Sequence, residues 1–262
     1  MSIISLTTDF GDLYPAAMKA VILRINPAAQ IIDITHSIRQ AGIREGAFAL
    51  YSLVRYFPQG TVHIGVVDPG VGTSRRALAI KAGPEGEEQF FIGPDNGLLI
   101  PAARRLGEIE VYEITNPEIM LKSGISATFH GRDIFAPAGA YLSKGTPIEM
   151  VGSKISDFIS LDFENFGIDG SFLVGEVIFA DNFGNVITNI PEEVVLKFSN
   201  FGSQIEINSR RVPFVQTYGF VGPKKPLALI GSHGFLEIAV NKGNAALQFG
   251  LKSGDQVAIK IV

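Results

Sequence analysis

Short apolar runs alternate with helical patterns up to about Tyr141, and this alternation constrains the fold more than any other feature of the chain. The run Val62–Val67 is almost wholly apolar, as expected of a strand that is buried on both faces of a parallel sheet. Pro15 suits the first turn of a helix over Ala16–Ile25. Strands that alternate with helices predict an α/β domain whose mostly parallel sheet is covered by helices.

The hydrophobic periodicity places the elements of this region. We expect helices at Ala16–Ile25, Arg44–Phe57, Leu98–Leu106 and Ile134–Leu142. We expect strands at Ile3–Thr7, Ile31–Ile34, Val62–Val67, Ala77–Ile80, Phe90–Ile92 and Ile109–Ile114.

Beyond Tyr141 the pattern changes. Residues 145–170 are irregular and rich in Gly, Ser, Asp and Phe, which indicates a linker. Turn residues then separate short strands, which is typical of a compact β-barrel or sandwich; the strands are expected at Leu173–Phe179, Val186–Ile190, Gln204–Ile207, Leu227–Ile230, Leu236–Val240 and Gln256–Ile261. We therefore predict an α/β domain over residues 1–165 and a smaller all-β, barrel-like domain over residues 166–262.

Composition excludes several classes of protein. Of the 262 residues 46% are hydrophobic and none is cysteine, which argues against disorder, a disulfide scaffold, thiol catalysis and thiolate metal sites. The net charge of −4 comes without a basic stretch, so we expect no nucleic-acid partner. Only 18% of the residues are charged, against about 25% in typical soluble proteins, which suggests surface buried between subunits.

The sequence shows no signal for a membrane or for export. No segment approaches the roughly 18 consecutive apolar residues that a membrane-spanning helix needs. The first residues read directly as a strand and lack the basic region of a signal peptide. We therefore expect a soluble, cytoplasmic protein without a membrane partner.

Three carboxylates follow predicted strands: Asp9, Asp68 and Asp95. An aspartate in such a place most often caps a turn or a helix. Ligands of open α/β sheets, however, bind at the carboxyl ends of the strands. Three carboxylates at equivalent ends of one sheet therefore favour a ligand site.

The segment from Asp68 to Arg76 superficially resembles a phosphate-binding loop. It has no Gly-Lys-Ser/Thr ending, and Arg75 stands where a dinucleotide fingerprint would need its third glycine. Gly70 and Gly72 instead allow a sharp turn that would bring Asp68 and Arg75 together. Such a pair is as consistent with a structural role as with a functional one.

A second dense cluster, His130-Gly131-Arg132-Asp133, precedes the apolar helical run from Ile134. A helix entrance favours an anionic ligand. The other histidines, His36, His63 and His233, have less polar company. No HxxxH or HExxH spacing occurs, so we expect no histidine-based metal site.

In the second domain, two turn-like segments carry polar side chains. They are Asp181-Asn182-Phe183-Gly184-Asn185 and Gly231-Ser232-His233-Gly234. Taken alone, each is more often a hairpin turn than a site.

Together these segments resemble the family of S-adenosyl-L-methionine hydroxide adenosyltransferases, relatives of the fluorinase and chlorinase. The resemblance extends from residue 7 to about residue 246 and rests on six motifs in order. These motifs are Thr8-Asp9-Phe10-Gly11, Val67-Asp68-Pro69-Gly70-Val71-Gly72-Thr73, Pro94-Asp95-Asn96-Gly97, Thr128-Phe129-His130-Gly131-Arg132-Asp133, Asp181-Asn182-Phe183-Gly184-Asn185 and Ser232-His233-Gly234-Phe235-Leu236-Glu237-Ile238-Ala239.

The resemblance implies a fold, an assembly and a reaction. It implies an α/β domain, a β-barrel domain and a homotrimer whose ligand lies between the first domain of one subunit and the second domain of the next. Water or hydroxide would attack C5′ of S-adenosylmethionine and release adenosine and L-methionine. No cofactor and no metal are implied, because S-adenosylmethionine is the substrate.

The resemblance also implies residue roles. Asp68, Arg75 and His130 correspond to the family's catalytic triad, and Asp9 to the residue that binds the ribose hydroxyls. The second domain would supply the remaining substrate-binding residues: Asp181 and Ser232 for the methionine amine and carboxylate, Phe183 and Asn185 beside the adenosine. Whether His130 removes a proton from water or only positions a hydroxide beside Arg75 is open at this stage.

Three alternatives are kept. A halogenating relative would line its halide pocket with hydroxyl groups, where this chain has Asp68, Val71 and His130, so hydroxide transfer is favoured. A metal-dependent hydrolase would gather Asp9, Asp68, Asp95 and Asp133 around Mg²⁺, although no tight DxD cluster is present. A non-catalytic trimer would bind the nucleoside without releasing adenosine.

Overall fold

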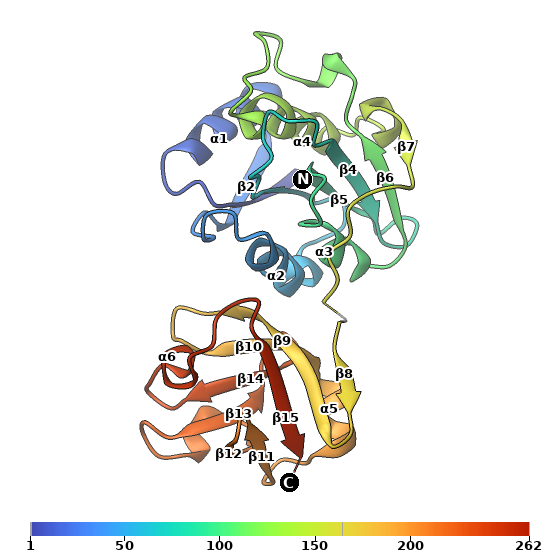
Figure 1. Ribbon diagram of the computed structural model, residues 1–262. Helices are drawn as coiled ribbons and strands as arrows, with labels where there is room; N and C mark the ends of the chain where they lie inside the picture. Colours follow the sequence, from blue (N-terminus) through green and yellow to red (C-terminus); the bar gives the residue numbers. More distant parts are fainter. Residues whose placement is uncertain (1, 164, 262) are drawn as a thin grey trace. The chain divides into compact units, whose positions relative to one another are not determined.

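A computed structural model describes residues 2–163 and 165–261 of the chain. The chain divides into two compact units, Met1–Leu161 (unit 1) and Asp162–Val262 (unit 2), and each is described by itself (Figure 1). Within the described residues, no helix combines the length and the apolar character needed to cross a membrane.

Unit 1 is built on a seven-stranded mixed sheet with the order β2-β1-β3-β5-β4-β6-β7. The strands are β1 (Ser2–Thr8), β2 (Ala29–Thr35), β3 (Val62–Val66), β4 (Ala77–Ala82), β5 (Gln89–Pro94), β6 (Ile109–Glu113) and β7 (Lys154–Ile155). The first four strands in this order pair in parallel, whereas β4 is antiparallel to both of its neighbours and β7 is antiparallel to β6.

The prediction of a mostly parallel sheet is therefore wrong. Only residues 83–88 separate β4 from β5. A connection of this length makes a hairpin, because a parallel pair needs a crossover of about a dozen residues or more.

Helices cover both faces of this sheet (Figure 1). One face carries α1 (Tyr14–Ile25) and α4 (Ala136–Ser143), which pack on each other, and the other carries α2 (Ile43–Leu53) and α3 (Ile100–Arg104). Close packing of α4 depends on Gly139, because a Cβ there would lie 2.6 Å from Cδ1 of Ile64 on β3. Apolar side chains packed between these helices and the sheet form the core of unit 1.

The strand order creates a switch point at the carboxyl ends of β1 and β3. The chain leaves β1 through α1 to β2 on one side, and returns through α2 to β3 on the other side. Thr8 on β1 pairs with Val66 on β3, so both strands end at the same edge of the sheet. Open α/β sheets bind ligands in the crevice at such a point, and Asp9 and Asp68 follow these two strands.

Unit 2 is an antiparallel, nearly closed barrel, which confirms the predicted barrel-like all-β domain. Its path is β12-β11-β15-β9-β10-β14-β13, and β8 pairs with β9. A bridge from Phe214, just after β12, to Ala228 on β13 joins the two ends of the path. The strands are β8 (Gly167–Asp169), β9 (Phe172–Ala180), β10 (Val186–Pro191), β11 (Gln204–Ile207), β12 (Arg210–Pro213), β13 (Pro226–Ile230), β14 (Phe235–Val240) and β15 (Gln256–Ile261).

Several short elements were not expected. The segment 145–170, predicted to be a linker, contains β7 and β8, which each pair with a neighbouring strand. Unit 2 also contains strand β12 and two short helices, α5 (Glu192–Phe198) and α6 (Ala245–Phe249). In unit 1 the helix predicted over Arg44–Phe57 ends at Leu53 and continues as a 3₁₀ turn.

Candidate active site

A buried ion pair follows β3. The Nη2 group of Arg75 donates to Oδ2 of Asp68 at 2.6 Å, and Nε donates to Oδ1 at 3.2 Å. The two side chains are only 8% and 4% exposed. A bidentate arginine–carboxylate pair fixes the orientation of both groups as well as their charge, so the guanidinium has a defined position at the switch point.

The loop that makes this pair depends on glycine. Gly72 has φ +76°, and a Cβ there would lie 2.1 Å from the carbonyl oxygen of Ala127. Within the loop, Thr73 donates from Oγ1 to the carbonyl of Gly70 at 2.7 Å. The chain therefore turns back sharply enough to place Asp68 beside Arg75, as the glycine spacing predicts. It also packs against the segment that leads to His130.

His130 completes a three-residue cluster. Nη2 of Arg75 lies 3.0 Å from Nδ1 of His130. His130 stands at the start of a π-helical turn, Gly131–Phe135 (η3), which runs into α4. A Cβ on Gly131 would come within 3.1 Å of the Phe10 ring, so glycine lets this turn approach the loop after β1.

The protonation of His130 follows from its surroundings. Burial of the ring, and secondarily the charge of Arg75, hold the pKa of His130 below its ordinary value. A guanidinium can only donate hydrogen bonds, so Nδ1 of His130 is the acceptor in the contact with Arg75. The neutral ring therefore carries its own proton on Nε2, an assignment made from the hydrogen bond.

Two of the carboxylates considered as metal ligands are held by neighbouring arginines. Asp95 accepts from Nη2 of Arg76 at 2.7 Å and from the Ile159 amide at 2.8 Å. Asp133 is fully buried and accepts from Nε of Arg132 at 2.6 Å and from the Ser126 amide at 2.8 Å. In residues 2–163 and 165–261, no three His, Cys, Asp or Glu side chains gather as a metal site would need.

Asp9 lies at the adjoining strand end. Its Oδ2 accepts from the Ala41 amide at 3.0 Å, which ties the β1 loop to the segment before α2. The side chain is half-buried. It thus lies at the same edge of the sheet as Asp68 and remains accessible from solvent.

His63 and His36 form hydrogen bonds within unit 1 and lie outside the Asp68–Arg75–His130 cluster. His63 is fully buried on β3, where Nδ1 lies 2.6 Å from Oγ of Ser5 and Nε2 lies 2.7 Å from Oε1 of Gln89. Burial lowers the pKa of His63 to about 4. His36 contacts Oγ1 of Thr8 at 2.9 Å.

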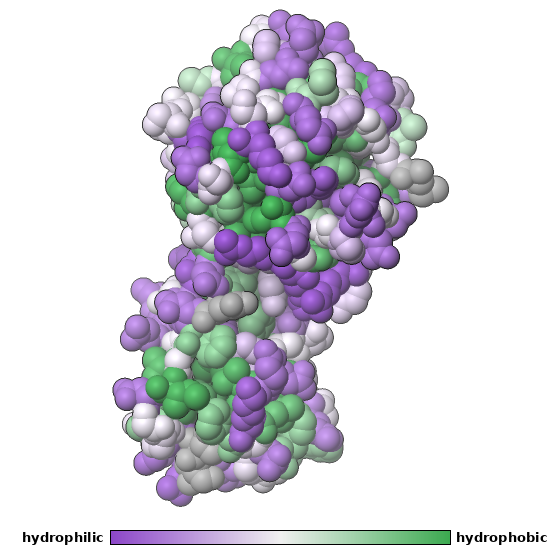
Figure 2. Space-filling model, turned by 90° about the vertical axis from the view of Figure 1, so that its right-hand side faces the viewer, coloured by the Kyte–Doolittle hydropathy of each residue, from purple (hydrophilic) through white to green (hydrophobic). Residues whose placement is uncertain are grey.

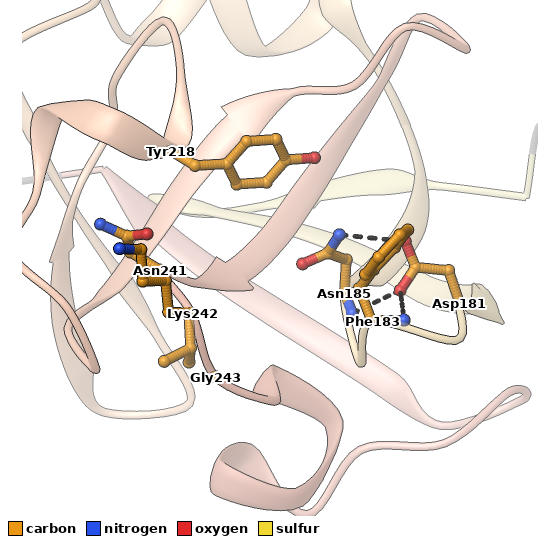
Figure 3. A pocket seen from close by; sticks show the side chains of 8 residues that line it. Asp181, Phe183, Asn185, Tyr218, Asn241, Lys242 and Gly243 are labelled. Atoms are coloured by element: carbon orange, nitrogen blue, oxygen red, sulfur yellow. Dashed lines mark hydrogen bonds between the residues drawn. The ribbon is translucent and has the colours of Figure 1, made fainter.

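Unit 2 contains a pocket of about 530 Å³ next to the turn between β9 and β10. It is lined by Asp181, Phe183, Asn185, Tyr218, Val240, Asn241, Lys242 and Gly243 (Figure 3). The ring of Phe183 is 79% exposed. An exposed aromatic ring beside side-chain amides suits a flat heterocycle, which can stack on the ring and hydrogen-bond to the amides.

The turn itself is organised by Asp181. Its Oδ1 accepts from the amides of Phe183 at 2.9 Å and of Asn185 at 2.8 Å, and its Oδ2 accepts from Nδ2 of Asn185 at 3.0 Å. The two carboxylate oxygens offer about four acceptor positions, so Asp181 can still accept from a ligand. Ser232 does not line this pocket in the described structure; it is exposed in the turn between β13 and β14.

Sequence reasoning missed part of the pocket. Tyr218 and the segment Asn241–Gly243 lie far from Asp181 along the chain and follow no recognisable motif. Pairing of β10 with β14, and of β14 with β13, brings these segments together. Only a knowledge of strand order could have identified them.

Comparisons with known proteins agree with both units. Residues 4–152 match the SAM hydroxide adenosyltransferase N-terminal domain, and residues 175–258 match the C-terminal domain of the same family. An (R)-S-adenosyl-L-methionine hydrolase from Salinispora tropica is 38% identical over 98% of this chain and 97% of its own. A fluorinase from Nocardia brasiliensis is 30% identical over 99% and 97% of the two chains.

A solved structure shows the same fold. The crystal structure of an uncharacterized conserved protein from Thermotoga maritima superimposes with a TM-score of 0.90. It is 40% identical in sequence, and the match covers 98% of this chain and 99% of the other.

Proposed function

This chain belongs to the SAM hydroxide adenosyltransferase family, and we propose that it hydrolyses S-adenosyl-L-methionine to adenosine and L-methionine. The observation that carries the proposal is the Asp68–Arg75–His130 cluster at the switch point of unit 1. The Salinispora tropica relative, named as a hydrolase of this substrate, matches the chain over nearly its whole length.

The reaction needs an oriented oxygen nucleophile more than it needs an acid. As the bond from oxygen to C5′ forms, the bond from C5′ to sulfur breaks and its electron pair leaves with methionine as a neutral thioether. No proton has to be supplied to the leaving group. Bulk water, with a pKa near 15.7, is a weak nucleophile, so the site has to hold and stabilise hydroxide or a partly deprotonated water.

The geometry of the cluster favours positioning over proton removal by His130. Both protons of Nη2 of Arg75 are directed at acceptors, one at Asp68 and one at Nδ1 of His130. With Nδ1 occupied, the ring offers Nε2–H as a donor. His130 therefore holds the attacking oxygen by donating to it, and Arg75 stabilises the negative charge on that oxygen. The oxygen loses its proton to solvent, before or after attack.

Substrate recognition is assigned to residues outside the Asp68–Arg75–His130 cluster. Asp9 accepts hydrogen bonds from the ribose hydroxyls, Phe183 and Asn185 contact the adenosine, and Asp181 and Ser232 hold the methionine amine and carboxylate. The exposed ring of Phe183 and the free acceptor capacity of Asp181 support these assignments.

Hydroxide is a better nucleophile for this site than a halide. The family includes fluorinases, such as the one from Nocardia brasiliensis. The Asp68 carboxylate in the cluster can accept a hydrogen bond from the O–H of water or hydroxide, whereas a halide has no proton to donate and is only repelled. The side chain of Val71, in the same loop, has no group that could donate a hydrogen bond to a halide.

The assembly and conditions of the reaction are part of the proposal. The enzyme acts as a homotrimer in the cytoplasm and uses neither a cofactor nor a metal. Large exposed apolar side chains support an oligomer: Leu13, Tyr56, Phe220 and Leu247 are each at least 65% exposed, and Figure 2 shows apolar patches on the surface of each unit. The ligand is shared between unit 1 of one subunit and unit 2 of the next.

Product analysis tests the proposal. Purified protein is incubated with S-adenosylmethionine in ¹⁸O-water, with and without a chelator and with added chloride or fluoride. We expect equal amounts of adenosine and methionine, with the label in the 5′-hydroxyl and no effect of the chelator. A 5′-halogenated product, or chelation that stops the reaction until Mg²⁺ is restored, would contradict it. Stoichiometric binding without release of adenosine would instead identify a nucleoside-binding protein.

A further inference from the structure

A buried carboxylate stands in the middle of the apolar strand β14. Glu237 is 4% exposed, and each of its neighbours on β14 is buried and apolar. Burying a carboxylate is unfavourable unless hydrogen-bond donors compensate for the lost water. An aliphatic side chain would fill the position at less cost, so the two oxygens of Glu237 point to a purpose other than stability.

One oxygen of Glu237 accepts a hydrogen bond from a residue that lines the pocket. The hydroxyl of Tyr218 donates to Oε1 of Glu237 at 2.6 Å. Burial and this carboxylate raise the pKa of Tyr218, so the phenol stays protonated and remains a donor. Figure 3 shows the Tyr218 ring on one side of the pocket, with Asn241 to Gly243 and the Asp181–Asn185 turn on other sides.

The other oxygen faces the turn that carries Ser232. Nε2 of His233 lies 3.3 Å from Oε2 of Glu237, while Nδ1 accepts from the Phe235 amide at 3.2 Å. Since Nδ1 accepts, the proton of the neutral ring is on Nε2, which donates to Glu237. Gly231 makes room for this contact, because a Cβ there would lie 2.3 Å from Nε2 and 2.7 Å from Oε2.

We propose that Glu237 is a positioning residue for substrate binding, which fixes the Tyr218 ring against the pocket and couples it to the 231–234 turn. This inference rests on the proposed function, in which the pocket and Ser232 contact one substrate. With its hydroxyl committed to Glu237, Tyr218 presents its ring to the ligand. Because Glu237 is buried and contacts Tyr218 and His233, it acts through these two residues on affinity rather than on the chemical step.

Three substitutions test the contact of Glu237 with Tyr218 separately from its contact with His233. Glu237→Leu removes both acceptors. Glu237→Gln keeps an oxygen that accepts from Tyr218. Its amide N–H₂ faces Nε2–H of His233, which is also a donor, so only the hydrogen bond to His233 is lost. Tyr218→Phe removes only the hydroxyl. Glu206→Gln is the matched control, because Glu206 lies on β11 beside Arg211 and outside the pocket lining.

The measurements are adenosine affinity by calorimetry, KM and kcat for S-adenosylmethionine, and Tm. We expect Glu237→Leu to weaken adenosine binding and raise KM about tenfold, as loss of hydrogen bonds to a charged group would. Glu237→Gln should show a smaller change in the same direction. kcat should stay within about twofold, and Glu206→Gln should behave as wild type. Tyr218→Phe added to Glu237→Leu should cause little further loss, because both changes remove the same contact.

Two results would overturn the inference. One is wild-type affinity in folded Glu237→Leu or, if that variant does not fold, in folded Glu237→Gln. The other is a parallel loss of kcat and affinity that follows Tm, which a purely structural role would produce. The proposed function is judged separately. If the wild-type protein releases no adenosine but the affinity changes occur as expected, the reaction is wrong and the role of Glu237 in binding stands.

Discussion

The two candidate regions of this molecule differ in how their polar groups are held. In unit 1, Asp68 and Arg75 are almost fully buried and bind each other through two hydrogen bonds before any ligand arrives. In unit 2, the pocket has an exposed aromatic ring, amides and a turn whose carboxylate retains acceptor capacity. Preorganised charge is what stabilises a transition state, whereas a partly open aromatic pocket is suited to recognition. The comparison predicts that substitutions in the Asp68–Arg75–His130 cluster lower turnover and that substitutions in the unit 2 pocket lower affinity.

The largest effect is expected at His130. His130→Ala removes the donor that holds the attacking oxygen, so kcat should fall by at least about 10²-fold, the scale on which a preorganised hydrogen-bond donor acts. The dissociation constant for S-adenosylmethionine should hardly change. Steady-state kinetics and calorimetry measure the two quantities. Near wild-type turnover in this variant would remove His130 from the mechanism and end the contrast between the units.

Asp9 tests whether unit 1 also takes part in recognition. A carboxylate that accepts from both ribose hydroxyls contributes about 1.5–3 kcal/mol. Asp9→Ala should therefore weaken binding of substrate and of adenosine alike, by roughly 10- to 100-fold, which calorimetry measures. If kcat alone falls, the ribose assignment is wrong.

Phe183 provides the reciprocal test in unit 2. Stacking of a base on an aromatic ring contributes about 1–3 kcal/mol. Phe183→Ala should raise KM and the dissociation constant for adenosine roughly 5- to 150-fold, with kcat at saturating substrate nearly unchanged. Phe201→Ala, another exposed aromatic residue of unit 2, is the control and should have no effect on either constant. A large loss of kcat in Phe183→Ala would place chemistry in unit 2.

The smallest expected effect concerns stability. Burial lowers the pKa of His63 to about 4, whereas an unfolded histidine has a pKa of about 6.5. The unfolded chain therefore binds the proton first as the pH falls, and unit 1 loses stability below about pH 6.5. The loss between about pH 7 and pH 5.5 should be on the order of 1 kcal/mol.

Chemical denaturation of wild-type protein and of His63→Gln at several pH values measures this loss of stability. The difference between the two proteins isolates His63 from the carboxylates that also titrate in acid. An identical pH dependence in both proteins would contradict the assignment of a neutral, buried His63.

Local sequence patterns predicted strands far better than they predicted the sheet. The buried run at Val62–Val67 and the alternation at Gln256–Ile261 are strands in the structure because apolar side chains at these spacings have to be buried. The direction of β4 was missed because direction depends on the length of the β4–β5 connection, not on the strand itself. Strand β12, with the sequence Arg-Arg-Val-Pro, carries too little apolar pattern to be recognised.

The residues of the candidate site likewise include contacts that the sequence predicts and contacts that it does not. Asp68 and Arg75 are seven residues apart with two glycines between them, so their proximity could be predicted from the sequence. Tyr218 and Glu237 are joined only because β13, β14 and the preceding segment fold onto one another. Contacts of this kind depend on strand order and register, which a single sequence does not specify.

The most direct test of a site shared between the two units is complementation. Asp68→Ala inactivates unit 1, and Asp181→Ala impairs unit 2. The two variants are dissociated, mixed in equal amounts and reassembled. In a head-to-tail trimer, an intact unit 1 from the second variant then faces an intact unit 2 from the first at about a quarter of the sites.

Activity is measured before and after subunit exchange, at a substrate concentration far below the KM of the Asp181→Ala variant, so that this variant alone contributes little. We predict that it returns toward about a quarter of the wild-type value, and only after exchange. If the subunits exchange freely and activity never returns, the account is contradicted, because chemistry and recognition would then have to reside in one chain.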